Sequence, residues 1–168
     1  MTFQNGSEVP EPLDLQNNFL KSEFLHLSEC AEYQDAVEEY CEELQNINRT
    51  LQQGNAHVGY RVRDEIVFYL LNNRKAELLN ENEAMDNEIM QKILPRIQGS
   101  SSSVKKMLCD LFKICAGDFA GYQTEDNDIS VQMMKIAEKP RCKYRKSALK
   151  IAFMVRRFEE DGFTSYGL

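Results

Sequence analysis

The sequence predicts an all-α protein, a bundle of five to six helices, and three observations lead to this. Apolar side chains recur at i, i+3, i+4 and i+7 in successive segments, the spacing that places them on one face of a helix. No segment alternates apolar and polar residues convincingly over the length of a β-strand. Glycine, proline and candidate capping residues stand between the periodic segments, where helices would begin and end.

The amino-terminal part differs from the rest of the chain. Residues 1–27 contain Gly6, Pro10 and Pro12 and show no helical period, so we expect an extended N-terminal segment there and a helical domain over residues 28–168. The extended segment closes with a short apolar patch, which consists of Phe19, Leu20, Phe24, Leu25 and Leu27.

The first predicted helix has the clearest stripe, with Ser28 as a candidate N-cap and Gly54 at its end. Its apolar positions are Val37, Tyr40, Cys41, Leu44, Ile47 and Leu51. A second helix is predicted from Tyr60 or Arg61. Its inward positions are Val62, Ile66, Tyr69 and Leu70, with Leu78 as a further candidate.

The third predicted helix begins at Asn80 and Glu83, which have the spacing of a capping box, and ends or kinks near Pro95. Serines 100–103 supply a loop and a cap for a fourth helix that ends at Gly117. Residues 118–128 are acidic and aperiodic, and we expect a loop there. Two last helices follow, at Ile129 to Glu138 and at about Tyr144 to Glu160.

Composition indicates one soluble globular domain and excludes several classes of function. The 168 residues are 42% hydrophobic and 28% charged, with a net charge of −7. An acidic chain is not expected to bind nucleic acid directly, because phosphate contacts need a basic face. No apolar run reaches the roughly 20 residues that span a bilayer, and no signal sequence is evident, so a cytoplasmic location and no membrane contact are expected. The five cysteines are expected to be reduced thiols rather than disulfides or metal ligands.

Residues that carry known chemistry are missing from the sequence. A phosphate-binding P-loop needs two spaced glycines followed by Lys and Ser or Thr, and Gly99 with its serine run lacks the second glycine and the Gly-Lys pair. His26 and His57 have no partner at metal-ligand or catalytic spacing. We therefore name no catalytic residue and no metal ligand, and we expect no enzymatic activity and no cofactor in this chain alone.

A cationic cluster opens the second predicted helix. Tyr60, Arg61 and Arg63 lie at the amino end, where the helix dipole is positive and arginine is unfavourable unless an anion is bound. The alternative is that Arg61 and Arg63 pair with Asp64, Glu65 or an acid of another helix. The residues alone leave both interpretations open.

Four runs of the sequence, in order, carry a resemblance to a known family. They read LQNINRTL (from Leu44), GYRVRDEIVFY (from Gly59), LPRIQGS (from Leu94) and FMVRRFEEDGFTSY (from Phe153). Together they resemble the carboxy-terminal part of McrB-like AAA+ proteins, which are related to the GTPase of methylcytosine-specific restriction systems. The opening MTFQN is similar to the end of the last strand of the AAA+ core in that group. Two departures are Gly167, where an aromatic residue is typical, and the segment RCKYRKSA, which lacks a common proline.

The resemblance implies that the chain is the AAA+ lid-like helical region that follows a nucleotide-binding core. It implies ATP or GTP with Mg in the full-length protein, assembly with the preceding core and neighbouring subunits of a ring, and a nuclease partner in DNA restriction and defence. Arg61 becomes the first candidate for a sensor-2-like residue that touches the nucleotide phosphates, and Arg96 the second, with Tyr60 and Arg63 in support.

The alternative function is a freestanding helical adaptor that binds another protein and has no nucleotide role. One observation separates the two readings. A lid requires a GxxxxGK[ST] run upstream in the same reading frame, whereas an adaptor does not.

Overall fold

The computed structural model describes residues 26–117 and 129–167, and these form an all-α bundle. The predicted extended segment lies almost wholly within residues 1–25, and the predicted loop at 118–128, so both fall outside the described residues. The helices and strands, in order, are η2 (Leu27–Tyr33), α1 (Gln34–Gln52), α2 (Tyr60–Ala76), α3 (Glu81–Glu88), η3 (Ile89–Ile93), η4 (Leu94–Arg96), β1 (Gln98–Gly99), α4 (Ser102–Ala116), α5 (Ile129–Ala137), α6 (Arg145–Asp161) and β2 (Thr164–Ser165).

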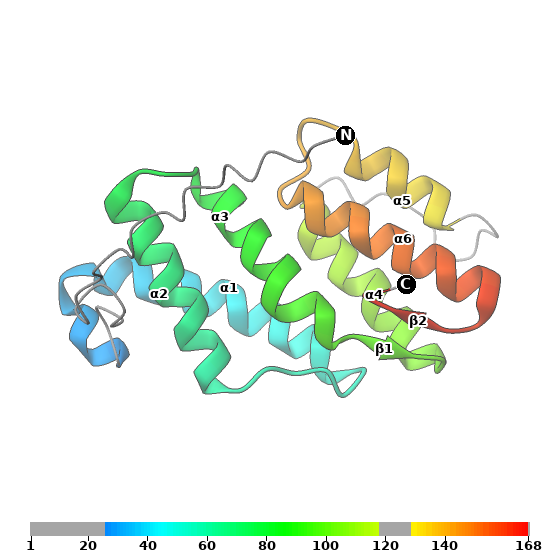
Figure 1. Ribbon diagram of the computed structural model, residues 1–168, viewed down its shortest axis with the longest axis horizontal. Helices are drawn as coiled ribbons and strands as arrows, with labels where there is room; N and C mark the ends of the chain where they lie inside the picture. Colours follow the sequence, from blue (N-terminus) through cyan, green and yellow to red (C-terminus); the bar gives the residue numbers. More distant parts are fainter. Residues whose placement is uncertain (1–25, 118–128, 168) are drawn as a thin grey trace, which may run out of the picture.

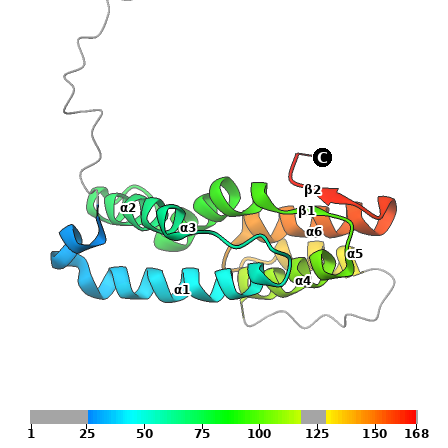
Figure 2. The ribbon, with the colours of Figure 1, turned by 90° about the horizontal axis from the view of Figure 1, so that it is seen from below.

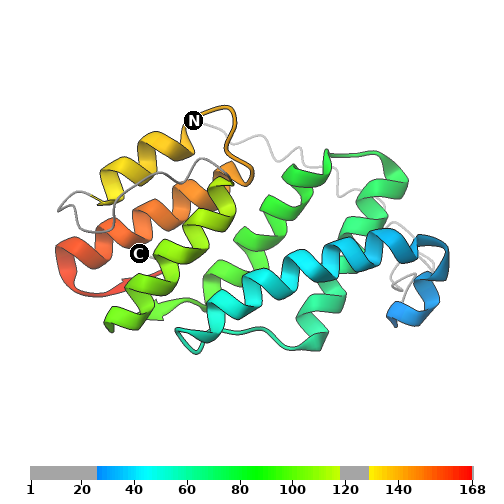
Figure 3. The ribbon, with the colours of Figure 1, turned by 180° about the vertical axis from the view of Figure 1, so that it is seen from behind.

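The helices pack in two layers (Figure 2). α1 and α4 run along one side and α2 and α3 along the other, while α6 packs against α3, α4 and α5. α2 and α3 run in opposite directions, so the start of α2 and the end of η4 lie toward the same edge of the molecule (Figure 1). Seen from behind, α1 and α4 face the viewer (Figure 3). Among the described residues, no helix is long and apolar enough to cross a membrane.

Local sequence explains most helix boundaries. The Asn80 side chain accepts a hydrogen bond from the backbone N–H of Glu83 at 2.9 Å, and Ser101 does the same for Val104 at 3.3 Å. Pro95 lies in the short 3₁₀ turn η4, which follows one π-helical turn, and the chain then becomes extended at Ile97. The predicted starts of α3 and α4 and the end near Pro95 are therefore confirmed.

Ser28 is not the N-cap of α1. It lies inside η2, a 3₁₀ helix whose backbone departs from helical angles at Cys30, with φ −94° and ψ 26°, and α1 begins only at Gln34. The kink at Cys30 lies within η2, so the helix that begins near Ser28 does not run continuously into α1. All five cysteines are free thiols, and Cys30, Cys109 and Cys115 are buried.

The core is formed by the apolar stripes of all the longer helices. Of the apolar positions predicted for the first two helices, Leu44, Ile47, Leu51 and Ile66 are buried, and Ile93, Leu108 and Leu111 of the following helices are buried with them. Phe158 is only partly buried, and two predictions for α2 are wrong, because Tyr69 is 37% exposed and Leu78 is 74% exposed. The run from Ile66 to Leu71 is entirely apolar, so its period does not define one face. Packing between α1 and α3 selects Ile66, Val67, Leu70 and Leu71 instead.

A small antiparallel sheet of two strands, each two residues long, joins the segment after η4 to the segment after α6. Gln98 pairs with Ser165, and Gly99 pairs with Thr164. Gly99 has φ +143°, which L side chains rarely adopt, and an added Cβ would lie 3.2 Å from Cγ2 of Val104. Two residues per strand are too few to produce an alternating pattern, which is why the sequence did not predict the sheet.

A buried carboxylate fastens α3 to the amino end of α6. Asp86 accepts hydrogen bonds from the backbone N–H groups of Lys146 and Ser147, both at 2.8 Å, and from the Ser147 hydroxyl at 2.5 Å. Asp86 and Ser147 are both buried. Asp86 thus acts as an N-cap that comes from another helix, since the residue at the start of α6, Tyr144, makes no side-chain cap.

We expect Leu108→Ala to lower the free energy of unfolding by about 2 to 5 kcal/mol, because it removes a fully buried side chain and leaves a cavity between α4 and its neighbours. Phe153→Ala on α6 is the matched control, since that side chain is exposed and should cost less than about 1 kcal/mol. Urea unfolding followed by circular dichroism measures both. Equal losses would contradict the helix packing described here.

Candidate functional site

The amino end of α2 is held by α1. The Asn48 side chain donates to the Val58 carbonyl at 3.2 Å and accepts from the Val58 N–H at 2.7 Å, so the loop before α2 is fixed. Gly59 is the N-cap of α2, and its carbonyl accepts hydrogen bonds from the backbone N–H groups of Val62 and Arg63. Gly59 provides no side-chain cap, and the first turn contains no acid, so the positive end of the helix dipole is left without a negative partner from that turn.

Arg61 projects from this helix end into solvent. Its side chain is 91% exposed, and its Nε lies 3.1 Å from Oε1 of Glu65, one turn further along α2. The pairing that the second interpretation predicted therefore exists, but it is not buried. Such exposed i,i+4 pairs contribute about 0.2 to 0.5 kcal/mol, and the order Arg before Glu is the less favourable one. An anion could displace Glu65 from Arg61 at little cost.

Glu65 also connects α2 to the next helical segment. Its Oε2 accepts from Nζ of Lys92, in η3, at 3.0 Å. The hydrogen bond from Lys92, followed by that from Arg61, holds the pKa of Glu65 below its ordinary value. Four residues after Lys92 stands Arg96, which is exposed and forms no ion pair with any of the described residues. Glu65 thus pairs with both Arg61 of α2 and Lys92 of η3, and Arg96 lies about one helical turn after Lys92.

Tyr60 and Arg63 lie on the side of the helix end that faces α1. The Arg63 guanidinium stands 4.9 Å from the centre of the Tyr60 ring and pairs with Asp64 at 2.6 Å. Both residues line a surface hollow of about 420 Å³, together with His57 and Gln45. Arg63 is half-buried and neutralised by its neighbour, so it is a supporting residue of the surface rather than an open cation.

Glu88 is a functional candidate that sequence reasoning missed. It is 3% exposed, and its Oε2 is buried without a hydrogen-bond partner among the described residues. Burial raises its pKa to about 7, against the opposing attraction of Lys92 and with a further contribution from Glu65. Its spacing could have identified it, because Glu88 stands three residues after Met85 and therefore on the apolar face of the third predicted helix.

Asp86 and Asn48 were also missed. Both are polar residues whose partners are distant backbone groups, and no local pattern marks such contacts. No group of three or more His, Cys, Asp or Glu side chains that could hold a metal ion occurs within residues 26–117 and 129–167.

The fold and this helix end define an all-α domain that presents an exposed arginine on a surface shared by several helical segments. The chain belongs to the family described as a domain of unknown function (DUF8727), whose model matches residues 9–163. No curated protein and no solved structure matches the chain.

We expect the stability of the protein to decrease as the pH rises from about 4.5 to about 7. In this interval native Glu88 retains a proton that an unfolded glutamate has lost, so a rising pH favours the unfolded chain. Glu88→Gln removes this titration, and its stability relative to wild type should increase by roughly 1 to 3 kcal/mol between pH 5 and pH 8, at about 1.4 kcal/mol per pKa unit. Parallel stability curves for the two proteins would contradict the raised pKa.

Proposed function

We propose that this chain is the C-terminal helical lid region of a McrB-like AAA+ nucleoside triphosphatase. In this proposal a preceding core binds ATP or GTP with Mg, and residues 28–168 cover the nucleotide and take part in ring assembly. The family described as DUF8727 has no stated function, so the proposal rests on the resemblance and on the contacts among the residues that carry it.

The single observation that supports this function most is that contacts link each of the four resembling runs to the next run or to residues immediately before it. Asn48, in LQNINRTL, holds the loop that leads into GYRVRDEIVFY. Glu65, in that second run, binds Lys92, two residues before LPRIQGS begins. Gln98 and Gly99 of LPRIQGS pair with the Thr164–Ser165 strand of the last run. Runs that are spread over the sequence therefore build one connected structure, as expected if they serve one purpose.

In this proposal Arg61 is the sensor-2-like residue. A guanidinium remains charged and can bind two phosphate oxygens, and it stabilises the charge that develops in phosphoryl transfer. Its exposure and its weak pairing with Glu65 leave it available to a nucleotide held by another domain. Arg96 is the second candidate, because it is exposed beyond the Lys92 link, and Tyr60 with Arg63 shapes the neighbouring surface.

The proposed partners are the preceding AAA+ core, neighbouring subunits of a ring and a nuclease, in a cytoplasmic system of DNA restriction and defence. This helical region is proposed to bind no nucleic acid itself and to catalyse nothing without the core.

A second candidate function is a freestanding adaptor that binds another protein. The exposed apolar side chains of Tyr69, Leu78 and Leu79, which cluster where α2 turns into α3, favour it. The two functions differ in their dependence on Arg61, which an adaptor that uses the α2–α3 turn would not need.

We expect Arg61→Ala, introduced into the protein together with its nucleotide-binding core, to lower nucleotide turnover by about tenfold or more. The free energy of unfolding should change by less than about 0.5 kcal/mol, because the side chain is exposed. Steady-state phosphate release and thermal unfolding measure the two effects.

Lys106→Ala is the matched control. Lys106 makes the same kind of exposed i,i+4 pair, from its Nζ to Oδ2 of Asp110 at 3.1 Å, but it lies on α4 and outside the four resembling runs. Its removal should leave turnover unchanged. If Arg61→Ala weakens the fold and spares turnover, or changes neither, Arg61 has no role at the nucleotide.

A further inference from the structure

The turn between α5 and α6 is strongly basic. Residues 139–146, KPRCKYRK, contain five bases and no acid, in a chain whose net charge is −7. This turn lies beside the amino end of α3 (Figure 1), and the two border a surface hollow of about 570 Å³. We call this part of the molecule the α5–α6 basic surface. It consists of Lys139, Pro140, Arg141, Arg145, Lys146 and Leu149.

Two cations of this surface have charges that the fold does not neutralise. Arg145 is exposed and forms no ion pair with any residue that the structure describes. The Nζ of Lys146 donates to the neutral Asn87 side chain at 2.9 Å and likewise has no acidic partner in the described part of the chain. Lys143 differs, because its Nζ pairs with Oε1 of Glu43 at 2.9 Å. The hollow is therefore bordered by two cations that do not serve the fold through ion pairs.

The same two cations stand where a helix disfavours them. Both lie in the first turn of α6, which contains no acid, and a base beside the positive end of a helix dipole is unfavourable. The backbone N–H groups of Lys146 and Ser147 are not open to a ligand, because both donate to Asp86. The side chains of Arg145 and Lys146, and not the helix end itself, are therefore the groups that an anion would meet.

The two acids that line the hollow, Glu83 and Asp86, do not supply the missing negative charge. Asp86 is buried, and its carboxylate accepts two backbone N–H groups and one hydroxyl of α6. Glu83 lies in the first turn of α3, where the positive end of that helix compensates its charge, and it forms no ion pair with the described bases. A carboxylate from outside the chain is what these cations lack.

The lining of the hollow favours a peptide over a nucleic acid. Pro140 and Leu149 add apolar surface beside the cations, and the volume is within the range of pockets that bind small molecules. A guanidinium binds a carboxylate through two parallel hydrogen bonds. A nucleic acid would need an extended basic face, whereas these bases are confined to one turn and the acids Glu43 and Glu83 lie next to them. Clusters of bases of this size are typical of sites that recognise acidic motifs.

We propose that the α5–α6 basic surface binds a short acidic segment of a partner protein, whose carboxylates pair with Arg145 and Lys146 while one large apolar side chain enters the hollow beside Leu149. The other bases of the turn attract the segment and increase its rate of association. The surface lies at the amino end of α3, whereas Arg96 follows the carboxyl end of the same helical segment. This inference therefore does not rest on the nucleotide role proposed above.

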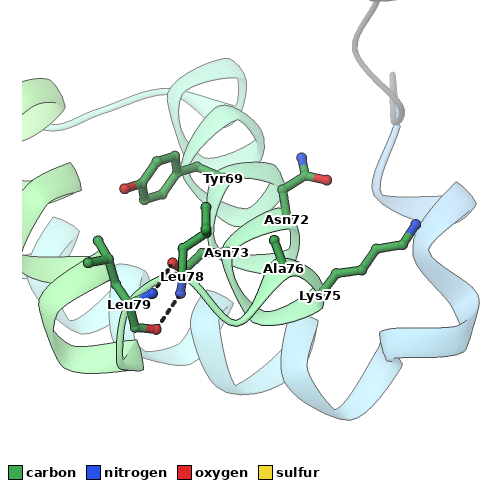
Figure 4. A pocket seen from close by; sticks show the side chains of 7 residues that line it. All are labelled: Tyr69, Asn72, Asn73, Lys75, Ala76, Leu78 and Leu79. Carbon is green, nitrogen blue, oxygen red and sulfur yellow. Dashed lines mark hydrogen bonds between the residues drawn. The ribbon is translucent and has the colours of Figure 1, made fainter.

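Selection from a library of short random peptides, displayed on phage and presented to the full chain, tests the proposal. The enriched peptides should carry acids on both sides of a large apolar residue. Measured by fluorescence anisotropy, such a peptide should bind Arg145→Glu at least about tenfold more weakly than the wild type. This variant should fold, because an acid is favourable in the first turn of a helix. Lys75→Glu is the matched control, since it makes the same change in net charge on the exposed lysine of the α2–α3 turn (Figure 4), and it should change the affinity less than about twofold.

Changes in the peptide test the same contacts without altering the protein. Replacing the acids of the enriched peptide by their amides, or its large apolar residue by serine, should each weaken binding at least about tenfold. The proposal would be overturned by a selection that enriches no acidic peptide on the wild type relative to Arg145→Glu, by an equal loss of affinity in Lys75→Glu, or by a peptide that binds as well without its apolar residue. An oligonucleotide of equal charge that binds as tightly as the peptide would also overturn it.

Discussion

The hydrogen bonds of Asp86 to the amino end of α6 are the interaction on which the arrangement of this bundle depends. A carboxylate without partners would be costly to bury, but Asp86 accepts two backbone N–H groups and one hydroxyl, and it lies at the positive end of the α6 dipole. It joins residues that are about sixty positions apart. Because α6 has no capping side chain of its own, helix formation in α6 and its docking on α3 are coupled.

The two parts of the chain that Asp86 joins are also joined at a second place, by the small sheet. α3 continues through η3 and η4 into β1, α6 continues into β2, and the two strands pair. One link between the segments is therefore the buried carboxylate and the other is the sheet, with Gly99 accommodating the close approach of Val104. The ion pair between Lys92 and Glu65 connects η3 to α2, and the hydrogen bonds between Asn48 and Val58 connect α1 to the loop before α2. Among these contacts Arg61 takes part only in the exposed pair with Glu65, which is why we propose that it serves a ligand rather than the fold.

The extent to which sequence predicts this structure depends on the range of the interactions. Local signals placed the helices, because caps such as Asn80 and Ser101 and the stop at Pro95 act within one turn. Periodicity failed at Tyr69, because an uninterrupted apolar run does not state which face is buried, and at Leu78, because α2 ends at Ala76 before that position is reached. The position of Arg61 at the start of α2 was predicted. The roles of Asp86, Asn48 and Glu88 were not, since each depends on what is placed opposite it by the fold.

Hydrogen exchange at the amino end of α6 tests the central claim most directly. The amides of Lys146 and Ser147 occupy the first turn of a helix, where amides normally lack partners, yet here both donate to Asp86. The account predicts that these two amides exchange slowly in the wild type and at least about tenfold faster in Asp86→Asn, while the amide of Val104, capped by Ser101 on α4, is unaffected. Rapid exchange of Lys146 and Ser147 in the wild type, or unchanged protection in the variant, would contradict it.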